Sequence, residues 1–280
     1  MALRLPSSLS PSKLSAFKDC PLAFRFAAID RLPEAPSPHG VKGTLVHRAL
    51  ERLFWDHGRG ARTPEAARAS LRAAWHDMQE DPELESLGLT EIEGAAFVAD
   101  AESLLDGYFA LENPDDIDAV GVELTLEADL GALRLRGIVD RLDVEGDGEF
   151  VVVDYKTGRA PSVMQEQQRL AGVQFYALLC EQVLGRRPAR VRLMYLRAPV
   201  VIEAAPSEQA VRGTRQRTTA VWGAIERACA LEDFRPRPSA LCNWCSYRAL
   251  CPVFGGDPSD AVVVAATEPP GNEPVVAAAS

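Results

Sequence analysis

Two carboxylates and a lysine occupy matching positions on the arms of a predicted β-hairpin. Apolar residues alternate along both arms of segment 137–156, and a glycine-rich turn centred near Asp147 separates them. This pattern is typical of antiparallel strands joined by a short turn. If the register is symmetric about the turn, Asp140 lies opposite Asp154, with the two β-carbons ~4.5–5.5 Å apart. Because strand side chains alternate between faces, Lys156 shares the face of Asp154.

This arrangement suits a divalent cation. Two carboxylates at the end of an otherwise apolar face repel one another, and each is costly to desolvate unless a cation lies between them. A hard ion such as Mg²⁺ or Mn²⁺, which prefers oxygen ligands, satisfies both. The ammonium of Lys156 could then stabilise negative charge on an attacking hydroxide or on a phosphorane-like transition state. The alternative is an ordinary Asp–Lys pair on an edge strand.

The same residues resemble the motifs of a known family. Gly-Ile-Val-Asp-Arg-Leu-Asp at 137–143, followed by Asp-Tyr-Lys-Thr-Gly at 154–158, resembles the core of the PD-(D/E)XK nucleases and in particular of the RecB-like exonucleases. The resemblance extends in ordered pieces from about Leu9 to Pro252. It implies an α/β fold, a restriction-endonuclease-like mixed β-sheet core flanked by helices, with a helical lobe inserted after the N-terminal helices. It also implies a metal-dependent DNA exonuclease, a hydrolase that cleaves phosphodiester bonds at single-stranded DNA ends and in which the two aspartates and the lysine are catalytic.

The resemblance assigns two further metal ligands. Gly-Thr-Leu-Val-His-Arg-Ala-Leu-Glu at 43–51 is similar to the histidine motif that precedes the carboxylates in RecB-like nucleases. This implies that His47 binds the metal beside Asp140 and Asp154, and imidazole suits Mn²⁺ better than Mg²⁺. The backbone carbonyl of Tyr155 is expected to complete the site. The alternative for His47 is a surface or half-buried helix histidine.

Substrate contacts are implied by the same resemblance. In the family, a Gln and a Tyr four residues later mark the helix after the hairpin and contact the substrate. Here Tyr176 is present, but Gly172 occupies the Gln position and Gln174 lies two residues before the tyrosine. We expect Gln174 and Tyr176 to be the contacts of an imperfect motif. Glu123, on the preceding predicted strand, is a further candidate because some relatives contribute an acidic residue there; the alternative is an exposed strand glutamate.

Three clustered cysteines form a second metal-binding pattern. Cys242, Cys245 and Cys251 have the spacing C-x2-C-x5-C, while Cys180 and Cys229 stand apart in helical contexts. Thiols this close in a cytosolic chain suggest a metal rather than disulfides. Three thiolates leave one ligand missing, and the spacing alone leaves zinc and an iron–sulfur cluster open.

The resemblance supplies a fourth cysteine. RecB-like nucleases with an iron–sulfur cluster take it from a segment similar to Ser-Ala-Phe-Lys-Asp-Cys-Pro at 15–21. This implies a [4Fe–4S] cluster bound by Cys20, Cys242, Cys245 and Cys251. Such a cluster would have a structural role and would join the two ends of the chain.

The distribution of charge is compatible with a DNA partner despite a net charge of −10. Residues 76–130 contain seventeen Asp or Glu and no Lys or Arg, so the rest of the chain is net positive. Residues 1–60 carry nine basic against five acidic residues, and residues 185–251 carry twelve Arg against five acidic residues. The cysteine site would bring these basic segments together around DNA. The alternative is solvated helix faces.

Periodicity and turn residues predict the order of elements. Helices are predicted at 11–20, at 44–55 after a Pro- and Gly-rich loop at 32–43, within 64–111, at 162–184 and at 207–231; strands are predicted at 120–130, 133–144, 149–155 and 191–196. We divide the chain into N-terminal helices with the first cluster cysteine (1–43), a helical lobe carrying the His motif (44–118), the nuclease core (119–206), a C-terminal helix with the iron–sulfur clasp (207–254) and a disordered tail (255–280).

Further sequence features concern location and partners. No apolar run reaches the ~18 residues that span a bilayer, and the first residues lack the features of a signal peptide. We therefore expect no membrane contact and a cytoplasmic location. The sequence contains no Gly-x-x-x-x-Gly-Lys-Ser/Thr loop, so a motor such as a helicase would have to be a partner in DNA repair or recombination.

Two alternative functions stay open. A CRISPR-adaptation exonuclease resembles this chain in both the metal site and the four cysteines. A non-catalytic DNA-binding clamp subunit of a helicase–nuclease would use the cysteine site alone. The presence of Asp140, Asp154, Lys156 and His47 together counts against the clamp.

Overall fold

The computed structural model describes residues 3–146, 148–160 and 163–261, with only the backbone for residues 163–171. Within this part the chain forms two compact units. The larger unit comprises residues 8–11 and 36–220. The smaller unit comprises the residues before Ser8, residues 12–35 and the C-terminal segment that begins at Val221. Segments from both ends of the chain therefore fold into one unit.

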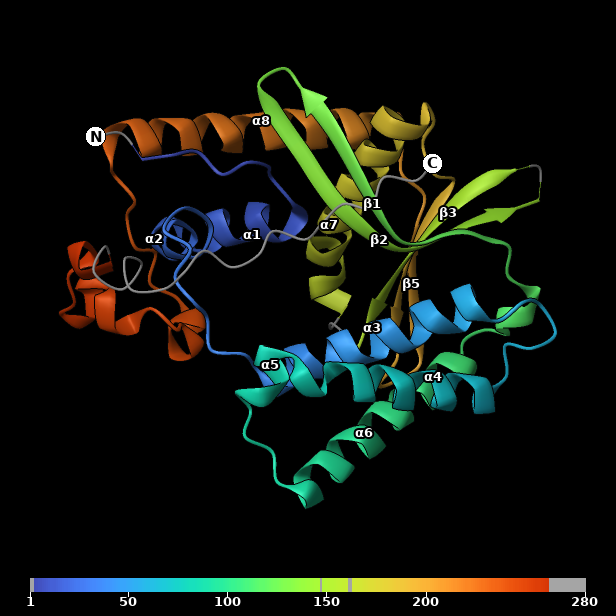
Figure 1. The fold of residues 1–280 in the computed structure, drawn as a ribbon. Coiled ribbons are helices and arrows are strands. Elements are labelled where there is room, and N and C mark those ends of the chain that lie inside the picture. The colour runs from blue at the N-terminus through green and yellow to red at the C-terminus, as the bar shows by residue number, and fades with distance from the viewer. Residues whose placement is uncertain (1–2, 147, 161–162, 262–280) are drawn as a thin grey trace. The chain divides into compact units, whose positions relative to one another are not determined.

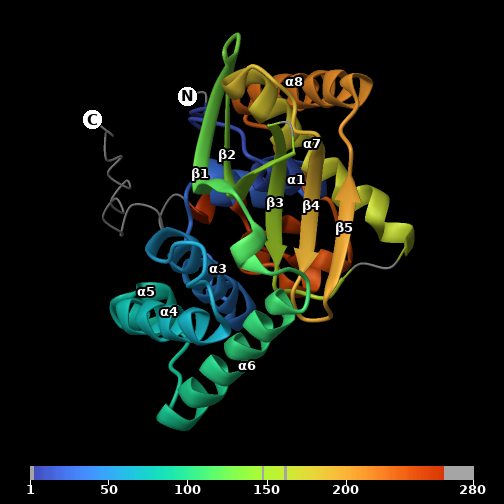
Figure 2. The same cartoon turned by 90° about the vertical axis from the view of Figure 1, so that its right-hand side faces the viewer.

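A mixed sheet of five strands forms the centre of the larger unit, in the order β1-β2-β3-β4-β5 (Figure 2). The strands are β1 (Ala119–Leu130), β2 (Leu133–Glu145), β3 (Glu149–Lys156), β4 (Arg190–Tyr195) and β5 (Val200–Ala204). β3 and β4 pair in parallel, and the other neighbours pair antiparallel. This sheet, flanked by helices, confirms the predicted fold class. β5 was not predicted because exposed valines at its start break the alternation of buried and exposed residues.

The hairpin of β2 and β3 has the predicted register. Its ladder runs from Glu145 opposite Glu149 to Arg141 opposite Val153, which is the symmetric pairing expected about Asp147. Asp147 itself lies outside the described residues. β2 continues beyond this ladder and pairs with β1 as far as Leu133. The far parts of β1 and β2 therefore extend beyond β3 as a two-stranded ribbon (Figure 1).

Four helices before β1 form the predicted lobe. They are α3 (Pro38–Asp56), α4 (Pro64–Asp77), α5 (Pro82–Glu85) and α6 (Glu91–Phe109). Their buried apolar residues share one core with Val151, Val153 and Tyr155 of β3. The lobe is thus packed directly on the strand that carries the Asp-Tyr-Lys motif. After β3, the helix α7 (Val163–Leu184) packs against β1, β2 and β5.

Helix α3 begins earlier than the sequence suggests. We predicted a loop through Gly43, but the helix starts at Pro38, and the Ser37 side chain accepts a hydrogen bond from the Gly40 N–H at 3.0 Å. Proline is favoured at the first helical position, and serine at the N-cap. The start was mispredicted because Gly40 and Gly43, which are typical of loops, lie in the first part of the helix.

The smaller unit joins the N-terminal helices to short C-terminal turns. α1 (Pro11–Asp19) ends before Cys20, as Pro21 predicts, and α2 (Pro21–Phe24) follows. The C-terminal part of α8 (Glu208–Leu231) leads into 3₁₀ turns between Ala240 and Asp260. The hydroxyl of Tyr247 donates to the Leu32 carbonyl at 3.2 Å, and its ring lies 5.3 Å from that of Phe26.

The predicted tail, residues 255–280, is described only in its first part. A helical turn forms at Pro258–Asp260 and Ala261 is buried, while residues 262–280 lie outside the described residues. Among the helices that the structure describes, none is both long and apolar enough to cross a bilayer.

Candidate active site

Three acidic residues lie side by side on neighbouring strands. The residues on either side of Glu123 in β1 pair with those on either side of Asp140 in β2, so Glu123 faces Asp140. On the other side of β2, the next opposing positions after Arg141 and Val153 are Asp140 and Asp154. We call Glu123, Asp140 and Asp154 the carboxylate row. Glu123 has φ 46°, a conformation uncommon for a residue with a side chain, and this irregularity interrupts the regular ladder at the row.

His47 approaches the carboxylate row from α3. Its Nδ1 lies 3.6 Å from Glu123 Oε1 and 3.6 Å from Asp140 Oδ1. One potential ligand atom from each of these residues lies within 4.8 Å of the others. Adjacent ligands of an octahedral ion with metal–oxygen distances near 2.1 Å are about 3 Å apart. The three side chains are therefore close to the spacing that a divalent cation requires.

The burial of the carboxylates adds to this fit. Asp140 is 8% exposed and Asp154 is 4% exposed. Burial is the largest cause that raises the pKa of Asp140, to about 7 overall; the charges of Asp154 and Glu123 add to the rise, whereas His47 and the Tyr155 N–H oppose it. A cation between the carboxylates would remove this penalty because it stabilises their charged forms. The acidic cluster is thus a possible metal site.

Lys156 and Asp154 form an ion pair at the end of β3. Burial lowers the pKa of Lys156, but the charges of Asp154 and Asp140 outweigh it and raise the pKa overall. The ammonium therefore remains protonated at neutral pH. The group of potential ligand atoms within 4.8 Å contains His47, Glu123 and Asp140 and does not include Asp154. Asp154 therefore lies next to His47, Glu123 and Asp140 but is paired with Lys156.

Tyr155 links β2 and β3 through its backbone. Its N–H donates to Asp140 Oδ2 at 2.6 Å, so β3 fixes the orientation of the carboxylate on β2. Its ring meets the ring of His47 edge to face, with the centroids 5.9 Å apart. One residue therefore contacts two members of the site, one by its peptide and one by its ring.

The structure brings Tyr176 to the site but separates it from Gln174. Burial and then the charges of Asp154 and Asp140 raise the pKa of Tyr176, which places its hydroxyl close to these two carboxylates. Residues two apart on an α-helix lie about 200° apart around its axis, so Gln174 points away from the face that carries Tyr176. Its Oε1 is buried without a hydrogen-bond partner among the described residues. Gly172 is exposed, and a β-carbon there would meet nothing within 4 Å.

An open cavity beside His47 is lined by residues that the sequence analysis did not name as site residues, although four of them lie within the His motif. It is lined by Gly40, Gly43, Thr44, Arg48, Glu51 and Ile138 together with His47 and Glu123. Most of these residues lie on one face of α3. Gly43, Thr44 and Glu51 lie three or four positions from His47, and this helical spacing is the signal that could have identified them.

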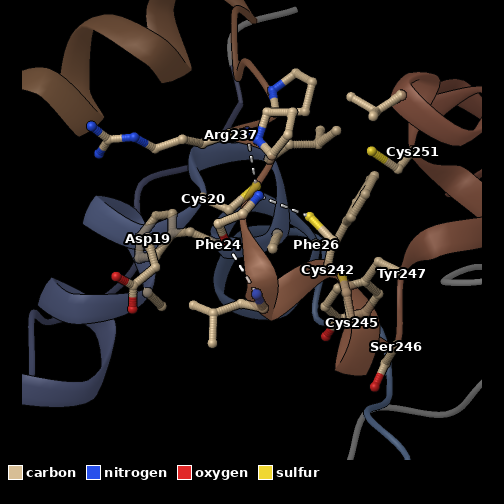
Figure 3. A pocket seen from close by; sticks show the side chains of 18 of the residues that line it. Asp19, Cys20, Phe24, Phe26, Arg237, Cys242, Cys245, Ser246, Tyr247 and Cys251 are labelled. Carbon is tan, nitrogen blue, oxygen red and sulfur yellow. Dashed lines mark hydrogen bonds between the residues drawn. The ribbon is translucent and has the colours of Figure 1, made fainter.

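The four predicted cluster cysteines line one cavity of the smaller unit (Figure 3). The Arg237 N–H donates to Cys20 Sγ at 3.4 Å, and the Ser239 N–H donates to Cys242 Sγ at 3.4 Å. Burial raises the pKa of Cys245, and the other three cysteines raise it further. Among the described residues, the ligand atoms of His47, Glu123 and Asp140 lie within 4.8 Å of one another, but no three of the four cysteine sulfurs do.

The other two cysteines have a different environment. Cys180 lies on α7 and Cys229 on α8, and both are buried. Burial raises the pKa of Cys180 to about 12, so its thiol stays protonated. Neither residue lines the cavity of the four cysteines, in agreement with their separate positions in the sequence.

The chain is similar to several known proteins. The gene 69 protein of Mycobacterium phage D29 is 26% identical over 272 residues, which cover 88% of this chain and 96% of that protein. One subunit of the ATP-dependent helicase/deoxyribonuclease of Streptococcus pyogenes serotype M3 is 25% identical over 159 residues, 55% of this chain but 14% of that subunit. A solved structure of a candidate exonuclease from Eubacterium rectale has a TM-score of 0.54 at 12% identity and covers 85% of this chain and 86% of its own.

The solved structure supports the fold, and the family is shown by a sequence match. The family model described as the PD-(D/E)XK nuclease superfamily matches residues 8–252. This range contains α3 with His47, the carboxylate row, Lys156 and all four cavity cysteines. The chain belongs to the PD-(D/E)XK nuclease superfamily.

Proposed function

We propose that the protein is a metal-dependent DNA exonuclease that hydrolyses phosphodiester bonds at DNA ends. The observation that carries this proposal is the approach of His47, Glu123 and Asp140 to within 4.8 Å of one another, beside the ion pair of Asp154 and Lys156. A cation site next to a protonated amine is the combination that phosphodiester hydrolysis needs. The family match supports a nuclease activity.

Each residue of the site has a proposed role. His47, Asp140, Asp154 and the backbone carbonyl of Tyr155 hold one or two Mg²⁺ or Mn²⁺ ions, and Glu123 is close enough to His47 to join them. When bound, the ion supplies the Lewis acidity that phosphodiester hydrolysis requires. Lys156 stabilises the charge that develops on the phosphate.

Helix α7 would contact the substrate. The Tyr176 hydroxyl is close enough to Asp154 for the charge of that carboxylate to raise its pKa, and we expect it to reach a phosphate positioned at the carboxylate row. Gln174 is the second proposed contact, and it would have to reach the DNA from the other side of the helix. We therefore expect Tyr176 to contribute more to catalysis than Gln174.

For the cysteine cavity we propose a [4Fe–4S] cluster bound by Cys20, Cys242, Cys245 and Cys251. The four cysteines line one cavity of the smaller unit, as a site shared by four thiolates requires. The N–H groups of Arg237 and Ser239 already donate to two of the sulfurs, and such bonds stabilise cluster thiolates. Zinc is the alternative occupant.

The proposed setting is DNA repair or recombination in the cytoplasm. The similarity to a helicase/deoxyribonuclease subunit supports a helicase as partner, although the match spans 14% of that subunit. No helix that could span a membrane occurs among the described residues.

A comparison of linear and circular DNA tests the exonuclease proposal. Purified protein is incubated with end-labelled linear single strands, with linear duplexes and with closed circular single strands, in Mn²⁺ and in chelator. We expect digestion of a linear substrate that requires Mn²⁺, with circular strands left intact. Cleavage of the circles would make the protein an endonuclease, and equal digestion in chelator would remove the metal-dependent mechanism.

A further inference from the structure

A charged network without an assigned role lies directly behind the carboxylate row. Arg141, which follows Asp140 in β2, is 0% exposed. Its Nε and Nη2 donate to the two oxygens of Asp143 at 2.8 and 2.9 Å. Its Nη2 also donates to Glu112 Oε2 at 3.1 Å. Its Nη1 donates to the hydroxyl of Tyr155 at 2.7 Å and to that of Tyr108 at 3.3 Å.

This network determines the position of the guanidinium from every side. Each of its nitrogens has an acceptor, and the ring of Phe54 lies 4.6 Å from its central carbon. A buried charge with incomplete partners would be strongly destabilising. The planar, forked guanidinium can meet this set of acceptors, whereas the single ammonium of a lysine cannot. The network is therefore rigid and specific for arginine.

The network is coupled to the site through Tyr155. The hydroxyl of Tyr155 accepts from Arg141, and the backbone N–H of the same residue donates to Asp140 at 2.6 Å. Successive strand side chains point to opposite faces, so Arg141 and Tyr155 project together from the face opposite Asp140 and Asp154. A fixed Tyr155 side chain thus fixes the peptide that orients the metal-binding carboxylates.

The network also gives the helical lobe a role. Tyr108 is the penultimate residue of α6, and Glu112 follows that helix by three residues. Both accept hydrogen bonds from Arg141. The end of α6 is thus attached to the two strands that carry the catalytic aspartates.

We propose that Arg141 is a positioning residue, which joins the helical lobe to Tyr155 and through it orients Asp140 and Asp154 for the divalent cation. The inference rests on the proposed function, because it takes the carboxylate row as the cation site. Residues that orient metal ligands from behind contribute about 10–100-fold to metal affinity. The proposal therefore predicts a loss of metal affinity without loss of a ligand.

Mn²⁺ binding by Tyr155→Phe tests this proposal. The variant removes the hydroxyl but keeps the ring against His47, and it leaves the Arg141 guanidinium with Glu112 and Asp143. The dissociation constant of Mn²⁺ is measured from the electron paramagnetic resonance signal of the free ion, with the full-length chain. We expect a roughly tenfold weaker affinity. Arg141→Lys is expected to weaken the affinity at least as much.

A matched variant separates positioning from general destabilisation. Asp100→Asn breaks the ion pairs of α6 with Lys42 and Arg197 and does not touch Tyr155. Even if its melting temperature falls as much as that of Tyr155→Phe or more, Asp100→Asn should keep the wild-type affinity for Mn²⁺. The positioning role would be overturned if Tyr155→Phe bound Mn²⁺ with wild-type affinity, or if Asp100→Asn weakened Mn²⁺ binding as much as Tyr155→Phe does. Nuclease activity of the wild-type protein would still support the proposed function in either case. A wild-type protein that binds no Mn²⁺ would overturn the proposed function as well.

Discussion

The backbone N–H of Tyr155 donates to Asp140 Oδ2 at 2.6 Å, so the motif on β3 holds the first aspartate of the motif on β2. Two segments separated by a turn are thereby combined into one site. Asp140 and Asp154 are the next residues after Arg141 and Val153, where the ladder of β2 with β3 ends, and the hydrogen bond selects the orientation in which Asp140 Oδ1 faces His47. The site therefore depends on both strands of the hairpin.

Replacement of Lys156 should reduce turnover more than metal binding. Lys156→Met removes the ammonium that neutralises developing charge, and it leaves the proposed ligands in place. We expect the rate of DNA cleavage at saturating Mn²⁺ to fall about 10²–10³-fold, with the Mn²⁺ dissociation constant within a few fold of the wild type. Single-turnover cleavage together with calorimetric Mn²⁺ titration measures both. A large loss of Mn²⁺ affinity at unchanged cleavage rate would contradict the role assigned to the lysine.

Asp140 should make the metal-free protein less stable as the pH rises. Its folded-state pKa of about 7 lies above the ordinary value for an aspartate, so the folded state binds the proton more tightly than the unfolded chain. Stability is then lost as the pH rises from about 4 to 7, on the order of 2–4 kcal/mol. Asp140→Asn should remove this loss, so in chelator the variant should melt higher than the wild type at pH 8. Added Mn²⁺ should stabilise the wild type alone. A pH-independent difference between the two proteins would contradict this account.

Asp100 should contribute stability that disappears in acid. Its carboxylate lies in a bidentate pair with Arg197, at 2.8 and 3.1 Å, and also pairs with Lys42. These partners hold the pKa of Asp100 well below its usual range, so the stabilisation is present at neutral pH and lost as the pH falls below about 4. After discounting for partial exposure, we expect Asp100→Asn to cost about 1 kcal/mol at pH 7. Urea denaturation should show a smaller difference between the two proteins at pH 3 than at pH 7, because the stabilisation is lost progressively as the pH falls from the ordinary aspartate pKa towards the lower folded-state pKa.

Gly107 should be essential for the packing of α6. A β-carbon at this position would lie 1.9 Å from the Leu196 carbonyl oxygen, which belongs to the backbone and cannot rotate away. Gly107→Ala should therefore cost about 3 kcal/mol or more. Gly172→Ala is the matched control, because its β-carbon meets nothing within 4 Å and alanine should add about 0.5–1 kcal/mol to helix α7. Equal melting temperatures of the two variants would refute the close approach of α6 to Leu196.

The cysteine cavity should bind iron, with loss of the cluster when one of its four ligands is replaced. Protein purified without oxygen should contain iron and sulfide and show visible charge-transfer absorption. Cys20→Ser should lose this absorption, whereas Cys180→Ser, a change at a buried cysteine outside the cavity, should keep it. A colourless protein that contains stoichiometric zinc would contradict the iron–sulfur cluster and show that the four cysteines bind zinc.

The resemblance to a known family predicted the fold class, and local patterns in the sequence predicted most strands. The hairpin register follows from alternation and a short turn, which are local properties, and the ladder of β2 with β3 confirms it. The start of α3 was predicted too late because Gly40 and Gly43 resemble loop residues, although Ser37 and Pro38 form a helix start. β5 was missed because a short edge strand has little burial and so no clear periodicity.

The site required information that no local pattern contains. Glu123 faces Asp140 only because β1 pairs with β2 in one register. The helical period explains why Gln174 and Tyr176 do not share a face, and this could have been read from their spacing. The partners of Arg141 could not have been predicted from local spacing, because Tyr108 and Glu112 belong to the lobe and lie 33 and 29 residues away in the chain. Long-range packing determines such contacts.

Cleavage of end-labelled linear DNA by Asp154→Asn tests the central claim most directly. Asp129→Asn is the control, since it makes the same chemical change at an exposed aspartate of β1 that pairs with Arg134. With Mn²⁺ present, we expect the wild type and Asp129→Asn to release labelled nucleotides at the same rate and Asp154→Asn to release them at least about 10³-fold more slowly. Release by Asp154→Asn at the wild-type rate would show that the carboxylate row is not the catalytic centre.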